Sequence, residues 1–296
     1  MATIVGSVKP PPFDYVRAAN LDDVWDALDA DEDAKVIAGG QSLIPLLSLR
    51  FASPSLLVDL GALGELTGVQ LTDSVLRIGA LTRHCEVERN AAIRAAAPLL
   101  AEAATWVAHP QIRNRGTLGG SVAHGDSAAE FPAALLALDA TMVARSRAGE
   151  RRVAATDFFL SYFTTALEPG EILAAVELPV ARSSSTWGFA EFARRRGDYA
   201  IGGAAVQAER DADGSCRSVR AGLLAAGPAP CLAPGLADAF AGRVVDRQLI
   251  AGVVDEALAR LAPGENVHGS AGYRKDVIGE MLRRALASAF ELGEVA

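Results

Sequence analysis

The sequence predicts a mixed α/β fold divided into two domains, and three observations support that prediction. The chain has 296 residues, which is more than one ordinary core organises. Up to about residue 180, short apolar runs typical of strands alternate with helix-like runs, and beyond it strand-like runs precede long helical ones. A polar, serine-rich run at 181–185 separates the two parts. We therefore expect one domain over residues 1–180 and a second over 186–296.

Composition and charge exclude several classes of protein. The chain is 50% hydrophobic and 22% charged, as folded globular chains are. Its net charge is −8 and it has no basic stripe, so we expect no nucleic-acid partner. The N-terminus has no signal-peptide core and no run approaches the roughly 18 apolar residues of a membrane helix, so we expect a cytoplasmic protein without a membrane span.

The cysteines predict no metal site on this chain. Cys85, Cys216 and Cys231 are widely spaced, and none of them belongs to a CxxC pair. A disulfide framework, a zinc site or an iron–sulfur cluster needs several closely spaced cysteines or histidines. We therefore expect isolated reduced thiols in or near the core.

The first sixty residues predict a strand, a glycine turn and a helix in that order. Asn20 is a good helix cap, and acidic residues follow it in the first turn. An apolar run over 35–38 predicts a buried strand that enters Gly39-Gly40, and 42–49 predicts a helix. This order points free backbone N–H groups at an anion. No GxGxxG or GxxxxGK[ST] motif occurs, and a glycine pair taken alone is more often an ordinary turn.

The rest of the first domain predicts further short elements, and three strands followed by helices come after it. Pro98 is expected near the end of one or two helices over 83–100, and Pro132 in the first turn of the helix that follows the glycine-rich stretch. The remaining expected elements are a strand at 56–60, hairpins at 69–78 and 141–154, a short aromatic helix from 156, strands at 172–178, 187–193, 201–209 and 219–224, and helices at 244–261 and 273–292.

A stretch at 111–130, QIRNRGTLGGSVAHGDSAAE, carries most of the candidate chemistry. Its glycines and small side chains cannot fill a core, but they let another molecule approach the backbone closely. Residues 117–121 can present successive N–H groups and two hydroxyls to a phosphate. Asp126 and Glu130 are acceptors suited to hydroxyls of a ribityl or ribose chain. The alternative makes Asp126 a turn residue and Glu130 an acid in the first turn of a helix.

No catalytic set is evident in the sequence. His109 and His124 flank the glycine turn, so either can touch a ligand or serve as a hydrogen-bonded structural residue. The chain has no HExxH, no GxSxG and no carboxylate pair with acid–base spacing. We therefore assign no catalytic residue. The combination predicts a protein that holds a reactive cofactor, which supplies the chemistry itself.

Four segments in order, 38–50, 111–140, 194–206 and 266–286, resemble the FAD-binding middle subunit of molybdenum hydroxylases. The carbon monoxide dehydrogenase medium subunit is the most similar type, and the resemblance covers nearly the whole chain. It implies a PCMH-like FAD-binding domain with lobes at roughly 1–60 and 61–180. It also implies a C-terminal α+β domain with a three-stranded antiparallel sheet and helices.

The resemblance also implies a set of FAD-binding residues. Two loops would surround the pyrophosphate, the acidic pair would contact the ribityl–isoalloxazine side, and Tyr199 and the backbone of Leu173 would lie near the ring. Ser127 and Glu130 depart from the family's usual pattern, which has proline and aspartate there. The complete set is Ala38, Gly39, Gly40, Gln41, Ser42, Thr117, Leu118, Gly119, Gly120, Ser121, His124, Asp126, Glu130, Leu173 and Tyr199. We expect valine at Gly40 or Gly119 to fill the pyrophosphate's space and leave the fold intact.

In this family FAD takes electrons from 2Fe–2S clusters of a small subunit and passes them to an external acceptor. A large subunit holds molybdopterin, and the resemblance implies a dimer of heterotrimers with clusters and molybdenum on the partners only. Two alternatives stay open. The chain could be a self-sufficient FAD-dependent oxidoreductase acting on a small molecule, with His124 or Tyr199 as its acid or base. It could also be a scaffold without cofactor. The substrate and the electron acceptor are left open.

Overall fold

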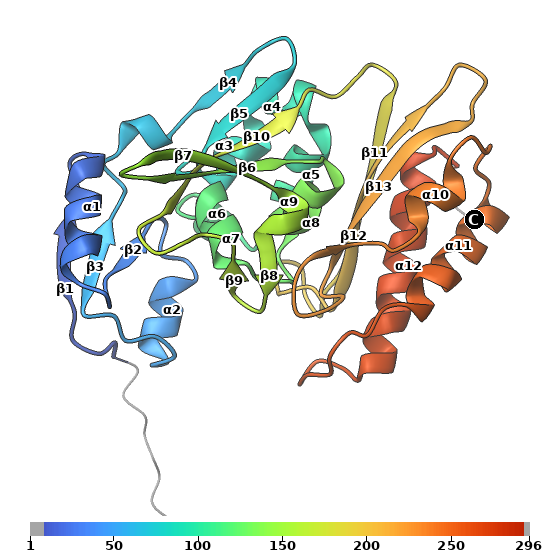
Figure 1. Ribbon diagram of the computed structural model, residues 1–296. Coiled ribbons are helices and arrows are strands. Elements are labelled where there is room, and N and C mark those ends of the chain that lie inside the picture. The colour runs from blue at the N-terminus through green and yellow to red at the C-terminus, as the bar shows by residue number, and fades with distance from the viewer. Residues whose placement is uncertain (1–8, 293–296) are drawn as a thin grey trace, which may run out of the picture.

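Three sheets of three to five strands, each with helices packed against it, follow one another along the described chain, which also has one two-stranded sheet (Figure 1). The computed structural model describes residues 9–292, so the outer ends of the two expected domains, 1–8 and 293–296, lie outside the described residues. The first lobe holds a parallel sheet of three strands in the order β1-β3-β2. Its elements are β1 (Asp14–Arg17), α1 (Leu21–Ala30), β2 (Lys35–Ile37), α2 (Leu43–Ser48) and β3 (Leu56–Asp59).

The first lobe forms as its sequence predicts. The side chain of Asn20 accepts a hydrogen bond from the amide of Asp23 at 3.0 Å, which caps α1. One face of α1 then buries Val24 and Trp25 against Val58 of the sheet. The same core extends to residues of the second lobe, so the two lobes share apolar contacts.

The second lobe is built on a five-stranded sheet in the order β4-β5-β10-β6-β7, whose adjacent strands are antiparallel where their register is defined. Both predicted hairpins are confirmed, and β10 lies between them. The strands are β4 (Val69–Leu71), β5 (Val75–Gly79), β6 (Thr141–Ser146), β7 (Gly149–Ala154) and β10 (Ile172–Pro179). The helices are η1 (Gly64–Leu66), α3 (His84–Arg89), α4 (Ala91–Ala96), α5 (Pro98–Trp106), α6 (Pro110–Arg113), α7 (Leu118–His124), α8 (Glu130–Ala137) and α9 (Ala155–Phe158).

Two expectations for this lobe are wrong. Residues 83–100 contain α3, α4 and the start of α5, because Asn90 ends one helix and caps the next. Pro98 begins α5, where a proline loses no helical hydrogen bond. The aromatic helix stops at Phe158, and the next residues pair as β8 (Phe159–Ser161) with β9 (Thr164–Thr165). Aromatic side chains favour extended backbone, which explains the difference.

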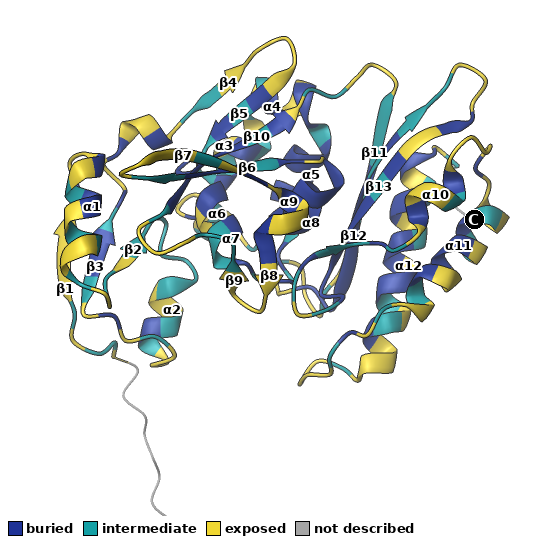
Figure 2. Cartoon of the chain, viewed as in Figure 1, coloured by how far each residue is buried: buried dark blue, intermediate teal, exposed yellow. Residues whose placement is uncertain are grey.

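The C-terminal sheet lies between the second lobe and the last helices (Figures 1 and 2). Its three predicted strands are confirmed, and a two-residue strand extends it to four in the order β11-β12-β13-β14. Segment 181–184 connects it to β10, and the exact domain limits stay a prediction. The elements are β11 (Ser185–Phe192), β12 (Gly202–Arg210), β13 (Cys216–Leu224), β14 (Cys231–Leu232), α10 (Leu236–Phe240), α11 (Arg247–Ala259) and α12 (Ala271–Ala289).

Two glycines let helices approach this sheet from opposite faces. A Cβ placed on Gly188 would lie 2.0 Å from the carbonyl oxygen of Ala285 in α12. One placed on Gly222 would lie 1.9 Å from the carbonyl oxygen of Ala133 in α8. Side chains alternate between the faces of a strand, so one face of the sheet packs on α12 and the other on α8 of the second lobe. None of the helices within residues 9–292 has the length and hydrophobicity needed to cross a bilayer.

Candidate functional site

The two glycine bends, defined as residues 38–42 and 117–121, lie against each other. A Cβ placed on Gly39 would lie 2.2 Å from the carbonyl oxygen of Arg115, just before the second bend. One placed on Gly120 would lie 3.9 Å from the Cβ of Ala38. The absent side chains therefore allow the two segments to meet, although about eighty residues separate them in the sequence.

The first bend borders an open groove of about 530 Å³, which is in the range of ligand sites. Gly40 has φ +70°, a left-handed conformation that favours glycine. The side chain of Gln41 donates to the carbonyl of Gly39 at 2.8 Å. Among residues 9–292, no acceptor takes a hydrogen bond from the amides of residues 40–42. The groove is lined by Tyr15, Ile37, Ala38, Gly39, Gly40, Gln41, Ile44, Pro45, Asp59, Ile112 and Arg115.

The second bend uses its amides within the protein, which corrects the expectation that they bind a phosphate in succession. The amide of Leu118 donates to Thr82 at 2.9 Å, and that of Gly119 donates to Ala80 at 2.8 Å. The amide of Gly120 donates to the hydroxyl of Thr117 at 3.1 Å, and that of Ser121 donates to the Thr117 carbonyl. Thr117 is thus the N-cap of α7. The exposed Gly120 and the half-buried Ser121 are its accessible parts.

Gly119 does not face the groove, so the expectation that Gly119→Val leaves the fold intact is wrong. The residue is buried, and an added Cβ would lie 2.4 Å from the Cβ of Ala80 and 2.8 Å from its carbonyl oxygen. A backbone at that distance cannot accept a side chain without moving. The glycine at 119 therefore serves packing, whereas the glycine at 120 faces the first bend.

A buried histidine supports the second bend from behind. The Nε2 of His84 lies 2.8 Å from the carbonyl oxygen of Thr117, and its ring packs edge-on against Phe131. Burial lowers the pKa of His84 to about 4, so the ring is neutral and its Nε2–H donates to that carbonyl. A Cβ on Gly116 would lie 2.6 Å from this ring. This role was not predictable from the sequence, since His84 belongs to no motif.

The acidic residues beyond the second bend lie in a partly desolvated site. Asp126 accepts a hydrogen bond from the amide of Ala128 at 2.9 Å, and Glu130 stands in the first turn of α8. Both turn and first-turn roles considered from the sequence are therefore present. Burial, together with the charge of Asp126, raises the pKa of Glu130.

Glu191 is a site residue that sequence reasoning missed. Glu191 follows Gly188 by three residues in β11, so the two lie on opposite faces of the strand. Gly188 faces α12, and Glu191 therefore points toward the second lobe. Its Oε2 is buried and has no hydrogen-bond partner within the described chain. Burial and repulsion by Glu130 raise the pKa of Glu191, which indicates that the two carboxyls share a low-dielectric region.

Tyr199, between β11 and β12, lies beside the first bend and the acidic pair. The residue is 64% exposed, and its hydroxyl is close to the side chain of Ser42. Partial desolvation of this hydroxyl and the nearby Asp126 and Glu130 raise the pKa of Tyr199, while the Ser42 side chain lowers it. The structure thus brings Tyr199, the first bend and the acidic pair to one place.

The remaining predicted residues lie at the edges of this site. His124 ends α7, stacks on Phe163 with ring centroids 4.9 Å apart, and has its pKa lowered by burial. Leu173 is buried in β10, so only its backbone is available to a ligand. The next residue, Ala174, accepts a hydrogen bond from the amide of Ala80, whose carbonyl binds the second bend. Ala174, which follows Leu173, is therefore joined to that bend through Ala80 by two backbone hydrogen bonds.

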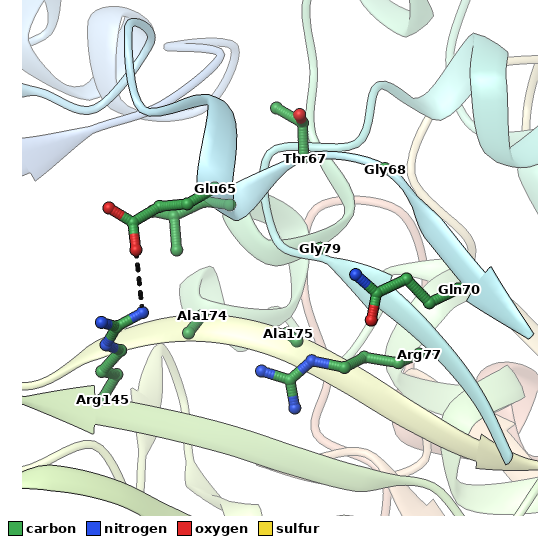
Figure 3. Close-up of a pocket in the computed structure, with 10 residues that line it drawn as sticks. Glu65, Thr67, Gly68, Gln70, Arg77, Gly79, Arg145, Ala174 and Ala175 are labelled. Carbon is green, nitrogen blue, oxygen red and sulfur yellow. Dashed lines mark hydrogen bonds and ion pairs between the residues drawn. The ribbon is translucent and has the colours of Figure 1, made fainter.

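A second hollow lies elsewhere, on the five-stranded sheet. It encloses only about 40 Å³, which is room for very few water molecules, and none of the predicted site residues lines it. In Figure 3 the side chains of Glu65 and Arg145 meet across it, with an ion-pair distance of 3.0 Å. This hollow is too small for a cofactor. Within residues 9–292 no group of three or more His, Cys, Asp or Glu residues is arranged to hold a metal ion.

The groove and its surroundings fit an elongated anion that also carries hydroxyls. Free amides in the first bend and the exposed guanidinium side chain of Arg115 favour a negative group. Asp59, in the lining of the groove, accepts a hydrogen bond from the hydroxyl of Tyr15 at 2.6 Å, and the acidic pair beyond the second bend supplies further acceptors near Tyr199. Tyr15, Asp59 and Arg115 were missed from the sequence, although Arg115 immediately precedes the glycine stretch.

Comparisons with known proteins identify two matched regions and close structural relatives. Residues 11–181 match the family described as the FAD binding domain in molybdopterin dehydrogenase, and 187–289 match the CO dehydrogenase flavoprotein C-terminal domain. The 6-hydroxypseudooxynicotine dehydrogenase complex subunit alpha of Paenarthrobacter nicotinovorans is 44% identical, covering 95% of this chain and 96% of the relative.

Two solved structures resemble the whole fold. A chain of carbon monoxide dehydrogenase from Hydrogenophaga pseudoflava superposes with a TM-score of 0.92 at 35% identity, covering 95% of this chain and 98% of that one. A chain of quinoline 2-oxidoreductase from Pseudomonas putida 86 gives a TM-score of 0.91 at 38% identity, covering 96% and 98%.

Proposed function

Because the chain belongs to the family of FAD-binding medium subunits of molybdenum hydroxylases, we propose that it holds FAD along the groove beside its first bend. The diphosphate lies on the free amides of the first bend, at residues 40–42. Arg115 supplies the opposite charge. The single observation that carries this assignment is the contrast between free amides in the first bend and occupied amides in the second.

The other residues divide between the two halves of the cofactor. Tyr15 and Asp59 line the groove, where Asp59 can accept from a ribose hydroxyl. Asp126 accepts from hydroxyls of the ribityl chain, and Tyr199, close to Ser42, covers the ring side. FAD supplies the redox chemistry, and these side chains bind it, orient it and exclude water. No side chain of this chain is assigned a catalytic proton transfer.

The partners and location follow from the family and are proposals for this chain. Electrons arrive from 2Fe–2S clusters of a small subunit, and a large subunit holds molybdopterin and the substrate, in a dimer of heterotrimers in the cytoplasm. The relatives are named as subunits of enzymes that act on nicotine-derived compounds and caffeine, which supports a complex of several subunits. The FAD-binding domain spans 1–180 and the C-terminal domain 186–296.

The substitution Gly40→Ala tests the site. Gly40 has φ +70°, and an added Cβ would lie 3.2 Å from the Cγ1 of Ile44 and 3.3 Å from the Cδ1 of Ile37, so the bend that carries the free amides must shift. We expect FAD affinity to fall about tenfold or more, measured by titration of the full chain with flavin fluorescence. Gly242→Ala is a matched control, because Gly242 has φ +68° and open space around it. Both variants carry similar backbone strain of about 1 kcal/mol, and only the first should lose FAD.

The outcomes separate the proposal from its alternatives. Equal FAD affinity in the two variants would remove the first bend from the site. A wild-type chain that takes up no FAD would favour the scaffold without cofactor. Turnover of a small molecule by the isolated, FAD-loaded chain would favour the self-sufficient oxidoreductase. Bound FAD without turnover until the cluster and molybdenum subunits are added is the result we expect.

A further inference from the structure

Arg274 is a buried cation without a carboxylate partner in the described chain. Its side chain is in the first turns of α12 and the residue is 9% exposed. Its guanidinium donates to three backbone carbonyls: Nε to Ile201 at 3.4 Å, Nη2 to Ala225 at 3.0 Å and Nη1 to Gly264. No ion pair involving Arg274 occurs within residues 9–292. The three carbonyls are therefore what compensates its charge.

Burying the Arg274 guanidinium costs free energy, which is unexpected for a residue that only contributes to stability. A buried guanidinium loses its hydration, and carbonyl dipoles return part of that energy. The N-terminal end of a helix carries partial positive charge, which disfavours a nearby cation, and α12 has no acidic residue in its first turn. Arginine suits the position because its planar fork can bind several acceptors at fixed angles. The geometry thus points to a role in fixing the segments that it joins.

The three carbonyls belong to segments that adjoin the proposed FAD site. Ile201 follows Tyr199 by two residues. Ala225 stands in a left-handed conformation with φ +58°, and its amide donates to the carbonyl of Ser127 at 2.7 Å, next to Asp126. Arg274 therefore connects the segment that carries Tyr199 to the turn that carries the acidic pair.

The third carbonyl leads to the same side of the molecule. Gly264 lies in the connection between α11 and α12, and a Cβ placed on it would be 3.4 Å from the hydroxyl of Tyr162. Tyr162 belongs to the β8–β9 hairpin, whose neighbour Phe163 stacks on His124. One side chain thus joins three backbone segments that all reach the edge of the site.

We propose that Arg274 is a positioning residue that sets Tyr199 relative to the Asp126–Glu130 turn and thereby shapes the ring side of the flavin site. This inference rests on the proposed FAD site. Arg274 does not touch the cofactor; it acts through the carbonyl of Ile201 on Tyr199, and through Ala225 and Ser127 on Asp126.

The test is a double-mutant cycle in the full-length chain. Arg274→Lys keeps the charge and loses the fork, so we expect FAD affinity to fall about tenfold and the visible absorption of bound FAD to shift. In a Tyr199→Ala background, the same change should lower affinity only about threefold, because the route through Tyr199 is gone and only the route through Asp126 remains. Arg283→Lys, in an exposed ion pair of the same helix, is the control and should change neither property.

The outcomes are distinguishable from failure of the proposed function. If the wild-type chain binds no FAD, the proposed site falls and this inference falls with it. If wild type binds FAD but the effect of Arg274→Lys is the same with and without Tyr199, Arg274 is only a structural residue. If Arg274→Lys does not fold, Arg274→Gln, whose amide can still reach a carbonyl, enters the same cycle, and additivity there overturns the inference equally.

Discussion

The first bend keeps the amides of residues 40–42 free of protein acceptors, whereas the second bend bonds its amides to Ala80, Thr82 and its own cap, Thr117. Both bends contain adjacent glycines followed by a polar residue, so the sequence alone does not separate them. The difference lies in what surrounds them. The first bend borders the groove. The second is hydrogen-bonded to Ala80 and Thr82, and Ala80 is hydrogen-bonded in turn to Ala174 of β10; we call this backbone contact the closed joint. The first bend is therefore the one that we propose for ligand approach, whereas Gly119 in the second serves backbone packing.

The largest expected effect concerns the closed joint. Gly119→Val forces a side chain against Ala80, where an added Cβ would already be 2.4 Å from its neighbour. We expect the free energy of unfolding to fall by about 3 kcal/mol, measured by urea denaturation of the chain without FAD. Loss of FAD affinity with unchanged stability would contradict the comparison and return Gly119 to the binding surface.

A smaller effect is expected where the bends touch. Gly39→Ala places a Cβ 2.2 Å from the carbonyl oxygen of Arg115, so the two segments must separate. We expect FAD affinity to fall by about 2 kcal/mol in binding free energy, measured by fluorescence titration. Gly64→Ala serves as the control because no atom lies within 4 Å of its added Cβ. Equal affinities in the two variants would show that contact between the bends is irrelevant to binding.

The smallest effect tests the charge beyond the second bend. Burial keeps a proton on the Glu130–Glu191 pair that the unfolded chain releases above about pH 4.3, so wild-type stability should fall as pH rises. Glu191→Gln removes this penalty. We expect the free energy of unfolding of the variant, relative to wild type, to increase by about 1 kcal/mol from pH 5 to pH 8. Urea unfolding at both pH values measures the gain. The exposed Glu256→Gln should show none, and a parallel pH dependence of wild type and Glu191→Gln would sink the idea.

Local patterns made much of the fold predictable. The Asn20 cap, both hairpins of the five-stranded sheet and the strand that enters Gly39 depend on neighbouring residues, which a sequence displays directly. Pro98 was misplaced because proline ends one helix or begins another with similar ease. The aromatic run after Asp157 was misread as a helix, although aromatic side chains favour extended backbone and the strand that they form pairs with the residues that follow it.

The site was predictable only in part, because its details depend on distant pairing. The bends were found from composition, and the structure brings them together. The acceptors of the second bend's amides, Ala80 and Thr82, lie nearly forty residues upstream, and nothing local announces them. Glu191 entered the site through the register of β11, and Arg274 through a packing arrangement among three segments.

The closed joint at Gly119 also bears on how this architecture can change over evolutionary time. Because its glycine is needed whether or not a flavin is present, a descendant that abandoned the flavin would still be held to glycine there by folding alone. Positions 41 and 42, whose backbone is not left-handed, have no such obligation and would be released to drift. The residues retained at those positions, rather than the glycine at 119, therefore record whether a lineage has continued to carry the flavin.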